Sequence, residues 1–209
     1  PLTDPEPDAG LLDAVDHVAL CVPGADLVST VDWYARVFGF RQIFEERVEV
    51  GAQAMDSRVV QSPSGAVTVT IVAPDASACP GQLDDFLRAH DGAGVQHLAL
   101  STPDIVGAVR ALGERGVAFL ATPDSYYDGI KERLGEVDLS IDALRAGNIL
   151  VDRDHWGEMF QIFTRSTVER GTFFFELIER HGALTFGSNN IRALYEAKER
   201  ARAEEHTPC

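Results

Sequence analysis

One stretch of this chain occurs twice in similar form, and this repeat restricts the folds that the chain can adopt. Residues 15–23 read V-D-H-V-A-L-C-V-P, and residues 95–103 read V-Q-H-L-A-L-S-T-P. Each copy is an apolar run of strand length with a histidine in third place, His17 and His97. A repeat of this length indicates one structural module built twice. Two modules that each carry a histidine on the same strand can bring both imidazoles to one place.

The pattern after each histidine strand predicts a helix and three further strands, so the fold class is α+β with two tandem βαβββ modules. In the first module a helix is expected from about Asp26 to Val37, with Gly39 closing it. In the second, Val117–Leu120 is predicted as the next strand. The predicted segments are a linker or arm (1–13), the first module (14–75), a linker with a short helix (76–94), the second module (95–187) with an insertion (122–146), and a C-terminal helix and tail (188–209).

Charge and composition exclude several classes of partner. The net charge of −15 opposes binding to nucleic acid or to an anionic membrane, because the electrostatic term would be repulsive. No apolar run approaches the ~18 residues of a membrane span. The three cysteines show no C-x-x-C spacing, so neither a disulfide framework nor a cysteine zinc site is expected. Together these features predict a cytoplasmic protein.

A carboxylate stands inside the apolar strand pattern F-F-F-E-L-I-E-R. On a strand, Glu176 shares a face with Phe174 and Ile178. Carboxylates are rare in such surroundings unless something pairs with them. A single strand histidine is more often a core residue, but two imidazoles and one carboxylate form the facial set that suits non-haem Fe(II). His17, His97 and Glu176 are therefore the candidate metal ligands, although spacing alone does not name the metal.

Longer motifs give the chain a family resemblance. They are G-A-G-V-Q-H-L-A-L, T-P-D-S-Y-Y-D, L-x-x-x-N-I-L-V-D, F-Q-I-F-T, F-F-F-E-L-I-E-R-H-G and F-G-S-N-N-I-R-A-L-Y-E-A. From about Val15 to Glu199 the chain resembles the catalytic C-terminal half of the 4-hydroxymandelate synthase and 4-hydroxyphenylpyruvate dioxygenase family, in the vicinal-oxygen-chelate superfamily. The resemblance implies an open mixed β-barrel around a metal site, a C-terminal gating helix, and an N-terminal half of the same enzyme as partner.

The resemblance also implies the site. Fe(II) is the expected cofactor, held by His17, His97 and Glu176, with no catalytic residue beyond these ligands. The positions that match the family's substrate pocket are Gln82, Gln96, Gln161, Phe163, Phe186, Asn190 and Ile191. Surface amides and core phenylalanines are the alternative interpretation of these positions. The other histidines, expected at the surface, are His90, His155, His181 and His206.

The implied reaction converts 4-hydroxyphenylpyruvate and O2 to 4-hydroxymandelate and CO2, by oxidative decarboxylation and benzylic hydroxylation. Two departures from the dioxygenase pattern favour this product. Ile191 stands where the dioxygenase has an aromatic residue, and T-I-V-A-P at 70–74 replaces its P-I-N-E-P. The alternatives are a dioxygenase that forms homogentisate, and a non-enzymatic module of the same superfamily that sequesters a small molecule. Whether the chain forms a homo-oligomer stays open.

Overall fold

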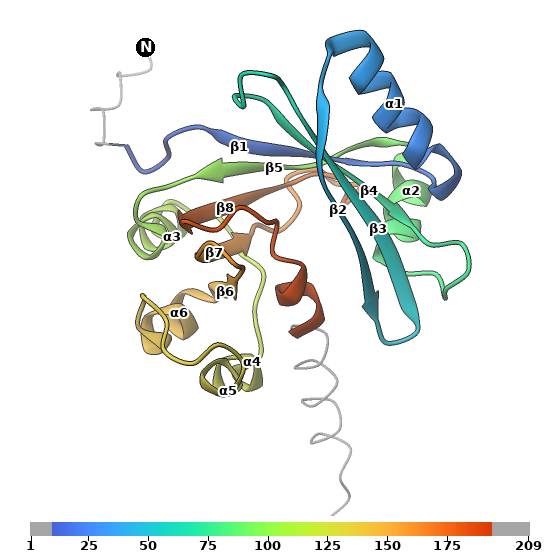
Figure 1. Cartoon of the computed structure of the whole chain (residues 1–209). Coiled ribbons are helices and arrows are strands. Elements are labelled where there is room, and N and C mark those ends of the chain that lie inside the picture. Colours follow the sequence, from blue (N-terminus) through green and yellow to red (C-terminus); the bar gives the residue numbers. More distant parts are fainter. Residues whose placement is uncertain (1–9, 194–209) are drawn as a thin grey trace, which may run out of the picture.

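One eight-stranded sheet forms the centre of the computed structural model, which describes residues 10–193 (Figure 1). The strand order is β2-β3-β4-β1-β5-β8-β7-β6. The strands are β1 (Val15–Cys21), β2 (Arg41–Val50), β3 (Gln53–Gln61), β4 (Thr68–Pro74), β5 (Gly94–Ser101), β6 (Leu150–Arg153), β7 (Glu158–Phe163) and β8 (Phe174–His181).

The sheet consists of two equivalent halves that meet at β1 and β5. These two strands pair antiparallel, while β1 pairs parallel with β4 and β5 pairs parallel with β8. Each half therefore has the connectivity βαβββ, and the order of strands on one side of the junction repeats on the other. The sheet curls across this junction (Figure 1). The predicted α+β fold with two tandem modules around an open, mixed barrel is confirmed.

The first three helices pack against strands of the sheet, and the other three lie in the insertion or at its end. They are α1 (Leu27–Phe38), α2 (Gln82–His90), α3 (Ile105–Glu114), α4 (Asp124–Asp128), α5 (Ile130–Leu134) and α6 (Ile141–Gly147), with a 3-10 turn at Gly24–Asp26. Gly39 ends α1 as predicted, because it adopts the left-handed conformation (φ 69°) that glycine tolerates best. Asp104 accepts a hydrogen bond from the Gly107 amide and so caps α3.

The main difference from the predicted elements lies in the second module. Val117–Leu120 was predicted as its second strand, and this is wrong: only Phe119 pairs, in an isolated bridge to Thr164. The place in the sheet belongs to β6, whose residues Leu150 and Val151 are buried in the core. The run at 117–120 has the composition of a strand, but Leu120 remains 48% exposed. Burial against the sheet therefore contributes little to forming a strand at this place.

Beyond β8 the chain returns across the open side of the sheet and is helical at residues 188–193 (Figure 1). Asn189 donates to the Asp152 carboxylate at β6, and the Arg192 side chain donates to the Glu49 carbonyl of β2. The segment thus contacts both halves. The predicted tail helix beyond residue 193, and most of the predicted arm at 1–13, lie outside the described residues. Within residues 10–193 no helix has the length and hydropathy to cross a membrane.

Candidate metal centre

The three candidate ligands lie on adjacent strands at the centre of the sheet. His17 is on β1, His97 on β5 and Glu176 on β8, where Glu176 stands opposite Ala99 of β5. The Glu176 Oε2 atom lies 3.6 Å from His17 Nε2 and 3.3 Å from His97 Nε2. One potential ligand atom from each residue falls within 4.8 Å of the others. The repeat therefore does bring both imidazoles together, and the carboxylate joins them.

The residue before each histidine contacts the other nitrogen of that ring. Asp16 Oδ1 lies 2.8 Å from His17 Nδ1, and Gln96 Oε1 lies 3.3 Å from His97 Nδ1. An ionised carboxylate only accepts hydrogen bonds, so His17 Nδ1 carries the proton and its Nε2 lone pair faces Glu176. Histidines that bind metals commonly donate their second N–H to a carboxylate or carbonyl in this way.

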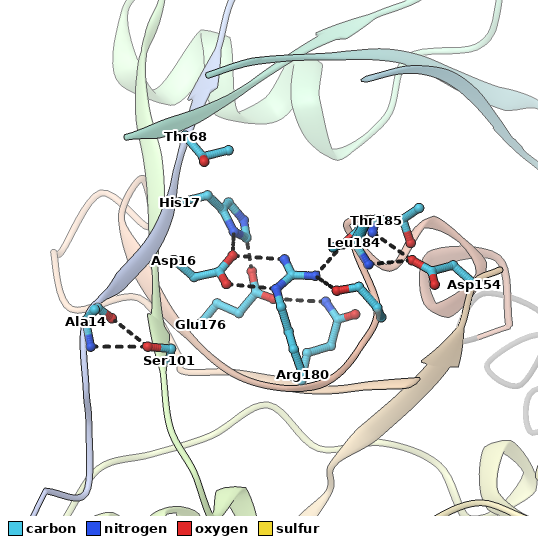
Figure 2. Close-up of polar contacts among 12 residues, drawn as sticks. Ala14, Asp16, His17, Thr68, Ser101, Asp154, Glu176, Arg180, Leu184 and Thr185 are labelled. Carbon is cyan, nitrogen blue, oxygen red and sulfur yellow. Dashed lines mark hydrogen bonds and ion pairs between the residues drawn. The ribbon is translucent and has the colours of Figure 1, made fainter. Parts of the chain in front are cut away.

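Arg180 of β8 extends this arrangement to the loop that follows (Figure 2). Its guanidinium donates two hydrogen bonds to the Asp16 carboxylate, at 2.8 and 2.9 Å, and further bonds to the carbonyls of Ala183 and Thr185. Burial raises the pKa of Asp16, but the hydrogen bonds from Arg180 and His17 outweigh burial and hold that pKa well below its usual range. Asp16 is therefore ionised over the physiological range.

Aromatic rings surround the two imidazoles. Phe186 packs edge-on against His17, with ring centroids 5.2 Å apart, and Phe174 stacks on His97 at 4.9 Å. Phe163 lies 6.3 Å from His97, and Phe44 of β2 lies 6.1 Å from Phe186. The wall near the cluster is thus apolar and comes from both modules. Of the predicted pocket phenylalanines, Phe163 and Phe186 both contact the histidines.

Two of the predicted pocket amides join the cluster from the Glu176 side. Gln161 Nε2 donates to Glu176 Oε1 at 3.1 Å, and Asn190 Nδ2 donates to Gln161 Oε1 at 2.9 Å. Gln96 contacts His97, as described above. Gln82 is exposed at the first position of α2, and Ile191 is half-buried beside Asn190. The roles of all these residues towards a substrate stay predictions.

The expectation for the other histidines is met only in part. His155 is exposed, and His206 lies outside the described residues. His90 and His181 are partly buried, and His181 hydrogen-bonds both Asp138 and Glu179. Both histidines lie near the end of a helix or strand with polar neighbours in the sequence, a pattern typical of a surface. One of the two carboxylates that enclose His181, that of Asp138, lies 43 positions away in the chain.

Sequence reasoning did not single out Asp16, Arg180, Phe44 or Phe174 as parts of the site. A signal existed for two of them. Asp16 precedes His17 as Gln96 precedes His97, and Phe174 shares a strand face with Glu176. Arg180 and Phe44 carried no such local signal, because their contacts form only when the sheet brings β8 near β1, across β5, and when the loop at 183–186 folds back.

The donor set can hold a metal ion. The two Nε2 atoms and Oε2 converge from adjacent strands, Asp16 fixes the tautomer of His17, and Gln161 occupies the second oxygen of Glu176. Two imidazoles and one carboxylate on one side are the ligand set of non-haem iron sites, whose remaining positions stay open. The geometry of the cluster itself fits such an ion.

Comparison with known proteins agrees with this site. The family profile of the Glyoxalase/Bleomycin resistance protein/Dioxygenase superfamily matches residues 16–133. A 4-hydroxyphenylpyruvate dioxygenase from Pyricularia oryzae is 34% identical over 202 residues, which are 92% of this chain and 48% of that protein. The dioxygenase of Sus scrofa is 34% identical over 195 residues, 90% of this chain and 50% of that protein. The chain spans about half the length of these curated relatives.

Solved structures give the same picture. A triple mutant of 4-hydroxymandelate synthase from Streptomyces coelicolor is 51% identical, with a TM-score of 0.81 over 91% of this chain and 55% of that one. A methylmalonyl-CoA epimerase from Mycobacterium tuberculosis, 21% identical with a TM-score of 0.51, shares the fold alone. The repeated modules, the curled sheet and the matched profile lead to one conclusion: this chain belongs to the glyoxalase/bleomycin resistance protein/dioxygenase superfamily.

Proposed function

We propose that this chain carries the metal centre of an Fe(II)-dependent oxygenase that acts on 4-hydroxyphenylpyruvate and O2 and releases CO2. The observation that carries the proposal is the convergence of three potential ligand atoms. His17 Nε2 lies 3.6 Å and His97 Nε2 lies 3.3 Å from Glu176 Oε2. When bound, Fe(II) would supply the redox chemistry and hold the keto acid and oxygen in contact. No catalytic residue beyond the three ligands is assigned.

The chain's own residues bind, orient and exclude water. Asp16 holds the proton at His17 Nδ1, so that Nε2 stays a ligand atom. The phenyl rings of Phe163, Phe174 and Phe186 offer an apolar surface beside the imidazoles, where the aromatic ring of the substrate can pack. An apolar wall also keeps bulk water from the reacting groups.

For the product we propose 4-hydroxymandelate. Support comes from the 51% identity to the Streptomyces coelicolor synthase mutant, against 34% for the dioxygenases of Pyricularia oryzae and Sus scrofa. Ile191 supports it too, because a small aliphatic side chain leaves the arylacetate portion room to turn its benzylic carbon to the oxidant. Homogentisate is the alternative product, and the similarity to the 4-hydroxyphenylpyruvate dioxygenases, which are 34% identical, favours it. The expected N-terminal half stays a prediction.

The test is to load the chain with Fe(II) without oxygen, add 4-hydroxyphenylpyruvate, admit O2, and follow oxygen uptake and the products by chromatography. We expect uptake and 4-hydroxymandelate. Homogentisate would overturn the product but keep a keto-acid oxygenase. Bound iron and bound keto acid without any oxygen uptake would overturn the enzyme proposal and leave the sequestering module of the same superfamily.

A further inference from the structure

A row of buried side-chain hydrogen bonds runs from the backbone of β6 to Glu176. The Val151 amide donates to the Tyr126 hydroxyl at 2.9 Å, and that hydroxyl donates to Asn190 Oδ1 at 2.6 Å. Asn190 Nδ2 donates to Gln161 Oε1 at 2.9 Å, and Gln161 Nε2 donates to Glu176 Oε1 at 3.1 Å. The row thus connects the insertion helix α4, the helical segment at 188–193, β7 and β8.

The Glu176 carboxylate at the end of this row sets the direction of every hydrogen bond in it. A carboxylate that binds a metal is ionised and can only accept, so the NH2 group of Gln161 must face Glu176. The Gln161 oxygen then faces Asn190, which presents its own NH2 group, and the Asn190 oxygen is left to face Tyr126. Only the phenol proton can satisfy that oxygen. All donors therefore point towards the carboxylate, an order in which each bond polarises the next.

The phenol has one proton and two acceptors within reach. Asn190 Oδ1 lies at 2.6 Å and the Val151 carbonyl at 3.0 Å. The carbonyl also accepts from Arg133 at 3.4 Å, so it has another donor, whereas the shorter bond to Asn190 completes the row. Tyr126, Asn190 and Glu176 are at most 2% exposed, so water does not replace a lost partner, and an orphaned group would keep its full desolvation cost.

The chain also packs directly against the middle of the row. Gly187 has φ 74°, and a Cβ atom placed there would overlap the Gln161 amide, so only glycine lets the backbone approach this closely. The Asn190 amide donates to the Gly187 carbonyl at 3.0 Å, which forms the turn that starts the helical segment. The placement of residues 187–193 and the placement of the Gln161 amide are therefore linked by contact.

We propose that Tyr126 is a positioning residue. Through Asn190 and Gln161 it holds Oε1 of Glu176, so that Oε2 alone faces the two imidazoles, and it couples the docking of residues 187–193 to the orientation of that carboxylate. The inference rests on the proposed function in one respect, because it takes Glu176 as a metal ligand. Tyr126 lies in the insertion and does not touch the cluster, so its effect is transmitted entirely by the row.

The experiment compares Tyr126→Phe with Tyr127→Phe in the full chain. Tyr127 is the matched control: it is the next residue of α4, it is 1% exposed, and it takes no part in the row. The first readout is amide hydrogen exchange of residues 187–193 in the metal-free chain. The second is a titration with Co(II), followed by its visible d–d absorption, which reports both affinity and ligand geometry.

For Tyr126→Phe we expect exchange at 187–193 about tenfold faster and Co(II) binding about tenfold weaker with an altered spectrum. Tyr127→Phe should leave both readouts at wild-type values. If either readout is unchanged in Tyr126→Phe, or if Tyr127→Phe gives the same changes, the inference is overturned, because the row is continuous and does not include Tyr127.

If Tyr126→Phe does not fold, Asn190→Asp decides, because it keeps the shape of the side chain but sets an acceptor against the Gln161 oxygen. The same two changes are expected from it, and wild-type behaviour overturns the inference. If the wild-type chain binds no Co(II), the proposed function fails, and the exchange readout in the metal-free chain then decides the inference alone.

Discussion

Asp16 and Gln96 hold equivalent places in the two modules, yet only Asp16 carries a charge. Both contact the Nδ1 atom of the histidine that follows them, but Asp16 also forms the ion pair with Arg180. The two imidazoles therefore have different support. His17 is held by a charged network that reaches the loop at 183–186, while His97 is held by a neutral amide and by ring stacking on Phe174.

Asp16→Asn tests this charged support. The amide oxygen can still accept from His17 Nδ1, but the attraction to Arg180 is lost, and we expect the affinity for a divalent metal to fall about tenfold to a hundredfold. Competition with a chelator of known affinity measures the change. Asp13→Asn, at an exposed position, is the control and should bind as the wild type does. An unchanged affinity in Asp16→Asn would show that His17 needs no charged partner.

Ile191→Phe tests the position proposed to select the product. A larger, flat side chain beside Asn190 restricts the rotation of the arylacetate portion, so we expect part of the product to shift from 4-hydroxymandelate towards homogentisate. Chromatography of the aerobic product mixture gives the ratio. Val28→Phe, which places the same ring at an exposed position of α1, is the control. A product ratio that stays at the wild-type value would remove Ile191 as a determinant.

At the scale of elements, Glu179 and His181 of β8 connect the sheet to α3 and to the insertion. The Ile105 amide at the start of α3 donates to Glu179 at 2.7 Å, and His181 contacts both Glu179 and Asp138. The hydrogen bonds to Asp138 and Glu179 raise the pKa of His181 above its ordinary value of 6.5. The contact is therefore strongest when His181 is protonated.

This gives the stability of the chain a pH dependence. Because the folded-state pKa of His181 is raised, its contribution is fully present below the unfolded value of 6.5 and is lost as pH rises through the folded value. We expect the difference in free energy of unfolding between wild type and His181→Gln to shrink across that interval. Urea unfolding at a series of pH values measures it. His155→Gln, at an exposed histidine, should give a difference that does not vary with pH in this way.

The elements were predictable where local pattern and burial agree. The two histidine strands, α1 with Gly39 at its end, and β8 around Glu176 follow from periodicity, turn residues and apolar runs. The prediction of a strand at Val117–Leu120 was wrong because a short apolar run does not reveal whether the sheet has a place for it. The two histidines followed from the repeat and Glu176 from the apolar strand around it. The bonds from Arg180 to Asp16 and from Tyr126 to Asn190 join residues more than 60 positions apart and have no local sequence signal.

At the scale of the molecule, the candidate ligands come from both modules. His17 belongs to the first half of the sheet, and His97 and Glu176 belong to the second, so a bound ion connects the halves across the β1–β5 junction. Ligand binding stabilises the folded state by about 2.7 kcal/mol when the free metal is one hundred times its Kd. Unfolding of the two halves should therefore become more cooperative when metal is present.

We expect a saturating divalent metal to raise the Tm of the chain by about 5–10 °C, and a chelator to reverse the shift. Differential scanning calorimetry measures both. Glu176→Ala should retain no iron and show no shift, while Glu114→Ala, at an exposed position of α3, should respond as the wild type does. A metal-dependent shift that persists in Glu176→Ala would contradict the ligand assignment.

The two halves of the sheet are alike in connectivity but not at the position of the carboxylate. Glu176 stands opposite Ala99, and the equivalent partner of Ala19 in the first module is Thr70, a buried residue whose hydroxyl lies 3.5 Å from the Val18 carbonyl. In this duplicated sheet only one of the two equivalent positions carries an acid, so the two sides of the centre differ in charge. The carboxylate of the cluster therefore comes from the second half of the sheet alone, because the equivalent residue of the first half is a neutral threonine.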